Sequence, residues 1–196
     1  MVAVGRFGLE LAPGGLRLAQ GLVNTTLSRN QGEPDLDLLS DTGTANDWAA
    51  PSLAEWAAAT GHTAPRLTLR RDDLPPLRRV REVLRRRLRA NAAHVDAPDE
   101  PIAAGAFDLD LTLTLHADGR IDYAPAGSGW RQLASLAVTE VLLAQAAGTL
   151  PRLKTCAALD CGAGFYDASP NRTRVWHDTK MCGNAPNLRA SRARRG

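Results

Sequence analysis

The chain carries CAALDC at residues 156–161 and HDTKMC at residues 177–182, and these two segments decide how its C-terminal part folds. In each segment four residues separate two side chains that bind soft metals, and all three cysteines of the protein lie there. Two matched pairs of this kind are what a tetrahedral zinc site requires. The predicted ligands are Cys156, Cys161, His177 and Cys182. Four protein ligands leave no open position for a catalytic water, so we expect one structural zinc ion.

Two other uses of these side chains stay open at the level of sequence. Free cysteines are common in protein cores, and a lone histidine is usually packed or exposed without binding a metal. A disulfide or redox role would leave one of the three cysteines unpaired. Cys156 and Cys161 flank small and polar residues rather than an apolar run, which favours zinc. Reduced thiols that hold zinc are typical of the cytoplasm, where we expect the protein.

The segment between the two pairs has a recognisable pattern. Its members are Phe165, Asp167, Ser169, Asn171, Arg172, Arg174 and Trp176, with Gly183 and Asn184 directly after Cys182. This pattern resembles the CGNR zinc finger, which usually follows an N-terminal ABATE domain in bacterial proteins. His177 stands where the family usually has a cysteine, and it is still a zinc ligand chemically. Ala185, followed by Pro186, stands where the family has the arginine of its name.

The resemblance implies a protein of two parts. The family is regarded as stress-induced transcriptional regulators that combine a DNA-binding finger with a front domain that senses a small molecule. Residues 1–150 would be the ABATE-like ligand-sensing domain, and residues 151–196 the CGNR-type finger with a basic C-terminal helix. A chain of 196 residues has room for one domain with a normal core and a small satellite. Such a satellite needs help to fold, which a bound metal provides.

The composition excludes some classes of protein. A hydrophobic fraction of 44% and a charged fraction of 23% are those of a soluble globular chain. The sequence has no run of eighteen apolar residues, and residues 1–11 lack a basic region followed by an apolar stretch. We therefore expect neither a membrane span nor secretion.

Charge is divided unevenly along the chain. Residues 151–196 contain nine Lys or Arg against three Asp, a net charge of +6, so residues 1–150 carry −3 of the total of +3. A basic module on a mildly acidic body predicts that duplex DNA meets the C-terminal end. The candidate DNA-binding residues are Arg172, Arg174, Lys180, Asn187, Arg189, Arg192, Arg194 and Arg195. The alternative is that an arginine-rich end only makes the chain more soluble.

The whole chain predicts an α+β fold: an N-terminal helical domain with a small antiparallel hairpin sheet, then a small treble-clef-like zinc finger. Residues 9–26 are rich in apolar side chains and resemble the opening of the ABATE domain. Within them Asn24 and Thr25 are candidates for lining a ligand pocket. The alternative is that these two residues cap or terminate a local element.

Two helices are expected between residues 30 and 94. Residues 30–50 are polar and predict mostly a loop, followed by a short helix from the N-cap Ser52 to Gly61. A stronger helix begins at Asp72 or Asp73. Its apolar positions are Leu77, Val80, Leu84 and Leu88. Its other face carries Arg78, Arg79, Arg81, Arg85, Arg86, Arg87 and Arg89. Three explanations of this arginine face stay open: the side chains contact DNA, they are solvated, or they pair with the acidic body.

From residue 107 onward the period of the apolar positions changes to two. Residues 107–115 alternate, and with residues 120–124 they predict an antiparallel hairpin with one wet side. Residues 130–148 are apolar nearly all round, which predicts a helix buried against the sheet and a neighbouring helix. In the finger, residues 164–167 and 174–176 are expected to pair as a hairpin between the two ligand pairs.

Two functions from different classes are compatible with these features. The first is a zinc-dependent, DNA-binding transcriptional regulator whose N-terminal domain senses a small molecule. The alternative is a zinc-stabilised ligand-binding or protein-interaction module that does not bind DNA, which Ala185 favours. No nucleophile, base and orienting group can be assembled from recognised spacing, so we do not expect an enzyme. An unidentified small-molecule ligand and a homodimer are both compatible with the sequence.

Overall fold

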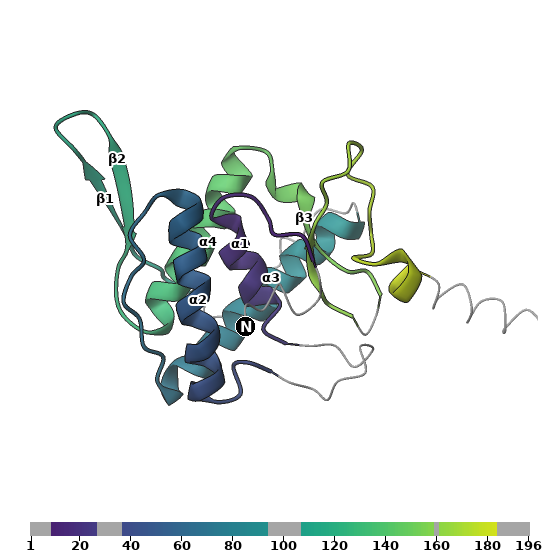
Figure 1. Ribbon diagram of the computed structural model, residues 1–196, viewed down its shortest axis with the longest axis horizontal. Coiled ribbons are helices and arrows are strands. Elements are labelled where there is room, and N and C mark those ends of the chain that lie inside the picture. Colours follow the sequence, from purple (N-terminus) through teal and green to yellow (C-terminus); the bar gives the residue numbers. More distant parts are fainter. Residues whose placement is uncertain (1–8, 27–36, 94–106, 159–160, 184–196) are drawn as a thin grey trace, which may run out of the picture.

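The computed structural model describes residues 9–26, 37–93, 107–158 and 161–183 (Figure 1). The helices are α1 (Leu16–Val23), α2 (Thr42–Thr60), α3 (Leu74–Ala93) and α4 (Trp130–Ala146). The strands are β1 (Leu111–Leu115), β2 (Ile121–Pro125), β3 (Leu153–Thr155) and β4 (Gly164–Tyr166). Three short helical turns are η3 (Arg71–Asp73), η4 (Leu150–Arg152) and η5 (Thr179–Gly183). The expected mixture of helices and small antiparallel sheets is confirmed.

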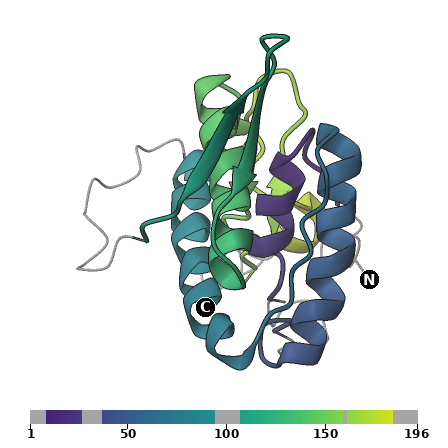
Figure 2. The same ribbon diagram turned by 90° about the vertical axis from the view of Figure 1, so that its left-hand side faces the viewer.

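Helix α1 lies in the middle of the molecule, with α2 on one side and α3 and α4 on the other (Figure 2). Nearly all of its side chains are buried, which is why an eight-residue helix is stable here. Trp48 and Trp56 of α2 belong to the same core. No helix among the described residues is long and apolar enough to cross a membrane.

Helix α2 begins ten residues before the expected N-cap Ser52. Its start is fixed by Asp41, whose Oδ1 accepts the backbone N–H groups of Gly43 at 2.8 Å and Thr44 at 3.0 Å. Ser52 donates instead to the carbonyl of Trp48 at 2.8 Å, inside the helix. The prediction of a loop up to residue 50 was therefore wrong for residues 42–50. Burial of Trp48 outweighs the weak helix propensity of this segment.

Helix α3 follows the prediction along its apolar face. Its four predicted apolar side chains are buried, and two prolines occupy its first turn. Its arginine face is not uniformly solvated, because Arg81 is only 4% exposed. The Arg81 guanidinium contacts the Asp37 carboxylate at 2.7 Å, and Arg85 donates to the carbonyl of Val23 at 2.9 Å. These two arginines join α3 to the rest of the body, so they are not part of an exposed DNA-binding face.

Strands β1 and β2 form an antiparallel hairpin that projects from the helices (Figures 1 and 2). Its apolar face is not covered: Leu113, Leu115 and Ile121 are 67%, 73% and 65% exposed. The expectation of a dry leucine face was therefore wrong for the outer part of the hairpin. Helix α4 is likewise less buried than predicted, since Leu142 and Leu143 are exposed.

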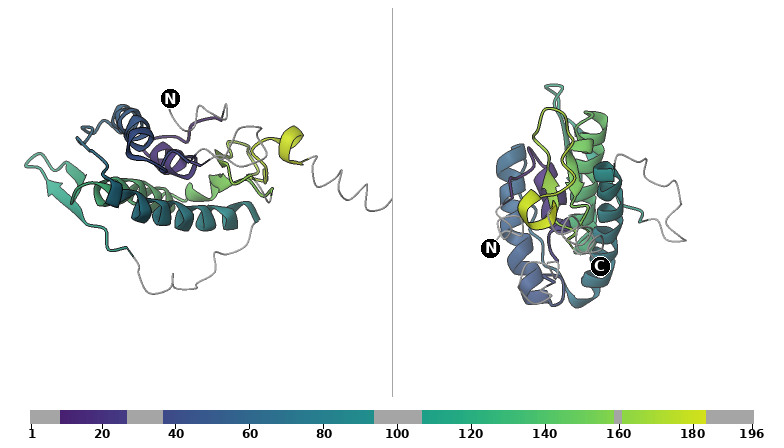
Figure 3. Two further views of the ribbon diagram at one scale, coloured as in Figure 1. Left: turned by 90° about the horizontal axis from the view of Figure 1, so that it is seen from below. Right: turned by 90° about the vertical axis from the view of Figure 1, so that its right-hand side faces the viewer.

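The C-terminal segment lies at the opposite end of the molecule from the hairpin (Figure 3). It is continuous with the helical core, because Leu153 of β3 is fully buried in the main apolar cluster. Asn91 of α3 donates to the carbonyls of Leu150 at 3.1 Å and Leu153 at 2.8 Å. The segment that carries the four predicted ligands is thus anchored to α3 directly.

Candidate metal centre

The first ligand pair lies in the turn between β3 and β4. Register pairs Thr155 with Gly164, and the backbone N–H of Cys156 donates to the carbonyl of Ala163 at 2.9 Å. The N–H of Cys161 donates back to Ala158 at 3.1 Å, so the chain curls within the turn. This curl turns both sulfurs toward the same side, as a metal-binding knuckle requires.

The pairing of these strands differs from the prediction. Strand β4 pairs with β3, so the expected hairpin between residues 164–167 and 174–176 was wrong. Residues 174–176 cross the first turn instead, where the carbonyl of Val175 accepts the N–H of Ala157 at 2.8 Å. Val175 and Trp176 favour a strand as strongly as residues 153–155 do, so propensity does not distinguish between these two partners of β4.

The second ligand pair is shaped by Asp178. Its carboxylate accepts the N–H of Met181 at 2.9 Å, and its carbonyl accepts the N–H of Cys182 at 2.9 Å. The hydrogen bond from Met181 lowers the pKa of the Asp178 carboxyl. These bonds start the turn η5 and bring Cys182 beside His177, with its sulfur 3.6 Å from the Nδ1 atom.

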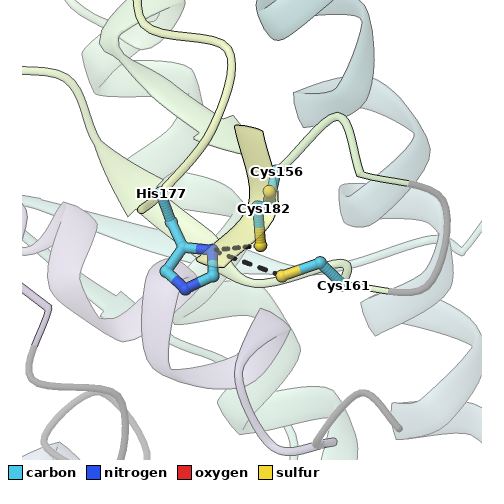
Figure 4. A group of neighbouring side chains, drawn as sticks. All are labelled: Cys156, Cys161, His177 and Cys182. Atoms are coloured by element: carbon cyan, nitrogen blue, oxygen red, sulfur yellow. Dashed lines mark hydrogen bonds between the residues drawn. The ribbon is translucent and has the colours of Figure 1, made fainter. Parts of the chain in front are cut away.

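The four side chains converge on a common centre (Figure 4). Their ligand atoms all lie within 4.8 Å of one another, and all four side chains are buried. The Nδ1 atom of His177 lies 3.3 Å from the Cys161 sulfur and 3.6 Å from the Cys182 sulfur. In a tetrahedral zinc site the usual bond lengths put a nitrogen and a sulfur about 3.6 Å apart. The cluster is therefore positioned to bind one zinc ion.

The electrostatics of the cluster also favour a cation. A hydrogen bond from Cys161 lowers the pKa of Cys156 to about 4, so one sulfur is readily ionised. Burial, with the charge of Cys156, raises the pKa of Cys182 to about 11. The sulfurs thus oppose one another's ionisation, and a divalent cation at their centre would relieve that repulsion. When bound, the ion would crosslink the two ligand pairs; four protein ligands suit a structural role.

Residues 152–195 match the family model of the CGNR zinc finger. The predicted zinc finger is confirmed by this match and by the geometry of its four ligands. No curated protein matches the chain. The resemblance of the front of the chain to an ABATE domain stays a prediction, and so does the treble-clef arrangement of the finger.

A buried ion pair organises the CGNR finger behind the metal cluster. The ammonium of Lys154 lies 2.9 Å from Oδ2 of Asp167, and these two side chains are 1% and 0% exposed. Lys154 also donates to the carbonyls of Arg172 at 2.5 Å and Arg174 at 2.9 Å. It therefore ties the chain that leads to His177 onto β3.

Asp167 is the acceptor at the centre of this network. Its Oδ1 accepts the hydroxyl of Ser169 at 2.6 Å, and its Oδ2 accepts the N–H of Arg174 at 2.9 Å. Burial opposes ionisation of this carboxyl, but the hydrogen bonds from Ser169 and Lys154 outweigh burial and lower its pKa to about 2. Sequence reasoning missed Lys154 and Asp167 as a pair. Residue type gave no signal for this pair, because the contact depends on how β3 and the segment after β4 fold together.

Asn24 and Thr25, the two candidates for a ligand pocket, are fully buried. The Asn24 amide forms two hydrogen bonds with the backbone of Gly164. The Thr25 hydroxyl donates to Leu22 at 2.8 Å and accepts from Arg81 at 3.0 Å. In this conformation neither side chain is available to a ligand. Asn24 ends α1, and it also attaches the finger to the body.

The described candidates for DNA contact lie on the outside of the finger. Arg172, Arg174 and Lys180 are all exposed. Arg174 also has a local role, since it donates to the carbonyl of His177 at 2.7 Å and its guanidinium lies 5.5 Å from the centre of the Phe165 ring. The remaining candidates lie outside the described residues. They are Asn187, Arg189, Arg192, Arg194 and Arg195.

Proposed function

We propose that the protein is a zinc-dependent, DNA-binding transcriptional regulator whose front domain senses a small molecule. The observation that carries the proposal is the zinc finger itself, a metal-fixed module with a net charge of +6 over residues 151–196. Three thiolates, one neutral imidazole and a zinc ion carry a net charge of −1, one less negative charge than a site with four thiolates. A centre of this kind repels nearby phosphates less.

The proposed mechanism has the zinc ion hold basic side chains in fixed positions. Lys180 lies in η5, the turn that also holds Cys182, and Arg172 lies on the loop that Lys154 ties to β3. Their positions therefore depend on the cluster and its supporting ion pair. Fixed cations lose less conformational entropy when they contact phosphates than cations on a loose chain do.

A salt titration tests DNA binding. Duplex DNA labelled with a fluorophore is titrated with the full chain at several salt concentrations, and anisotropy gives the affinity. With four to six phosphates neutralised, log affinity should fall against log salt with a slope of about −4 to −5. Arg172→Gln and Lys180→Gln should each weaken binding while the metal content stays at one zinc. A slope near zero, or binding that survives complete removal of zinc, contradicts the proposal.

A second function has its own observation in favour. The finger is docked on α1 through Asn24 and Gly164, and Leu153 belongs to the main core. A finger built into the body in this way could serve a ligand-binding or protein-interaction module without contacting DNA. In that case chelation would lower the thermal stability of the chain, while no duplex would bind at any salt concentration.

A further inference from the structure

At the start of α4 the molecule has a polar cavity of about 430 Å³ that the zinc site does not account for. It lies between the extended segment that follows α2, the turn η3 and the first turn of α4. Six of the residues that line it are Arg66, Thr68, Arg70, Asp73, Ser128 and Gln132. Its volume falls in the range of pockets that bind small molecules.

The extended segment aims its polar side chains into this cavity. Burial alternates from residue 66 to residue 70, with Arg66, Thr68 and Arg70 exposed while Leu69 is buried. Alternate residues of an extended chain point the same way, so the two guanidinium groups share one side of the segment. Asn46 holds the segment in place through two hydrogen bonds to the backbone of Leu69, at 2.8 and 3.0 Å.

The one acid that lines the cavity is already engaged. Oδ2 of Asp73 accepts the N–H of Arg70 at 2.7 Å, and its Oδ1 accepts the N–H of Trp130 at 3.1 Å. Gly129 leaves room for this carboxylate, since a Cβ atom there would lie 2.3 Å from Oδ1. Both oxygens of Asp73 therefore serve the backbone. Among the described residues, no carboxylate forms an ion pair with Arg66 or Arg70.

We infer that this cavity binds a small molecule that carries a carboxylate or phosphate group. Two guanidinium groups offer paired N–H donors that match the geometry of an oxyanion. The Gln132 amide and the hydroxyls of Thr68 and Ser128 line the same space and add further donors. This inference gives a ligand class to the sensing role proposed above. Binding itself is argued from the cavity, and only the use of that binding for sensing rests on the proposed function.

The position of the cavity separates it from the finger. Helix α4 has 17 residues and spans about 25 Å, with the cavity at its first turn. The finger begins beyond the other end of α4, after η4 (Figures 1 and 3). An oxyanion in the cavity is therefore a ligand distinct from a DNA phosphate held at the finger.

Calorimetric titration of the full, zinc-loaded chain tests the inference. The probes are inorganic phosphate and succinate, each at constant ionic strength with chloride as the balancing anion. Arg66→Gln/Arg70→Gln should weaken binding of the oxyanion probe about tenfold or more, since the double variant loses both guanidinium groups that donate to the oxyanion. The matched control is Arg86→Gln/Arg89→Gln, which removes two exposed charges of α3 outside the cavity and should leave the affinity unchanged.

Three results would overturn the inference. They are no heat with either probe, equal affinity in the wild type and Arg66→Gln/Arg70→Gln, and an equal loss in the control. The same variants are assayed for duplex binding, so that the two proposals can fail separately. A loss of DNA affinity in Arg66→Gln/Arg70→Gln with unchanged oxyanion binding would assign these arginines to DNA and also overturn the inference. Failure of the wild type to bind DNA leaves the result for the cavity intact.

Discussion

The side-chain amide of Asn24 forms two hydrogen bonds with the backbone of Gly164, through its Oδ1 to the N–H at 2.7 Å and its Nδ2 to the carbonyl at 2.9 Å. The two residues are 140 positions apart in the chain. A Cβ atom on residue 164 would lie 2.9 Å from Cγ1 of Val23, so only glycine allows this approach. The end of α1 and strand β4 of the finger are thus joined by a contact that depends on both residues.

Asn24→Ala should therefore destabilise the chain. The substitution leaves the buried N–H of Gly164 without its partner, which costs about 1–3 kcal/mol, while the Gly164 carbonyl keeps a longer hydrogen bond from Gln20 at 3.3 Å. We expect a loss of about 1–3 kcal/mol in the free energy of unfolding, measured by urea denaturation with zinc present. The control is Asn46→Ala. It also removes a side-chain amide that forms two hydrogen bonds with one backbone residue, Leu69, but Asn46 is only half-buried, so the loss of stability should be smaller. Equal losses would contradict a special role for the contact with Gly164.

Removal of zinc should destabilise the finger more than any other part of the chain. We expect one zinc per chain by elemental analysis, and a lower thermal midpoint after chelation because metal binding contributes to folding free energy. Cys161→Ser should abolish stoichiometric zinc. His177→Cys replaces one zinc ligand by another and should therefore keep one zinc per chain. Zinc at one equivalent in Cys161→Ser would show that the cluster is not the site.

Breaking the buried ion pair should be more costly than removing an exposed charge. Lys154→Met leaves the Asp167 carboxylate buried without its cation, which typically costs about 3–5 kcal/mol. Lys180→Met removes the same charge from an exposed position and should change stability by about 0.5 kcal/mol or less. Urea denaturation of both variants, each loaded with zinc, compares the two. Similar losses of stability in the two variants would contradict the prediction that burial makes Lys154 more important for stability than an exposed lysine.

The pKa of Asp167 makes the stability of the finger dependent on pH. Its folded pKa, about 2, lies below the value of 3.8 for a free aspartate, so ionised Asp167 stabilises the fold above pH 4 and this contribution is lost as pH falls through about 2. The shift corresponds to about 2 kcal/mol. The stability advantage of the wild type over Asp167→Asn should fall by about half between pH 6 and pH 3. A constant difference over that range would contradict the assignment.

The metal ligands were predictable from sequence because their residue types and matched spacing are local features. Cys156, Cys161, His177 and Cys182 are two pairs with equal separation, and they converge as predicted. Short-range signals also identified the left-handed glycine that ends α2, Gly61, with a φ of 77°.

The contacts between distant segments could not be predicted in the same way. The attachment of Asn24 to Gly164 and the ion pair between Lys154 and Asp167 depend on tertiary placement, for which residue type gives no signal. The helix between residues 42 and 50 was missed because its stability comes from burial of Trp48, not from propensity. Strand β4 was recognised, but its partner was not, because residues 174–176 favour a strand as strongly as residues 153–155 do.

The β1–β2 hairpin tests how much an exposed apolar side chain contributes to the free energy of unfolding. Leu113 and Leu115 alternate as a buried strand face would, yet most of their surface faces solvent. Leu113→Thr and Leu115→Thr should therefore change the free energy of unfolding by about 0.5 kcal/mol or less. Leu22→Ala, in the fully buried part of α1, should cost about 2–5 kcal/mol. Chemical denaturation measures all three. A loss near that of Leu22→Ala at Leu113 would show that the hairpin face is covered in solution, because only a buried leucine contributes so much.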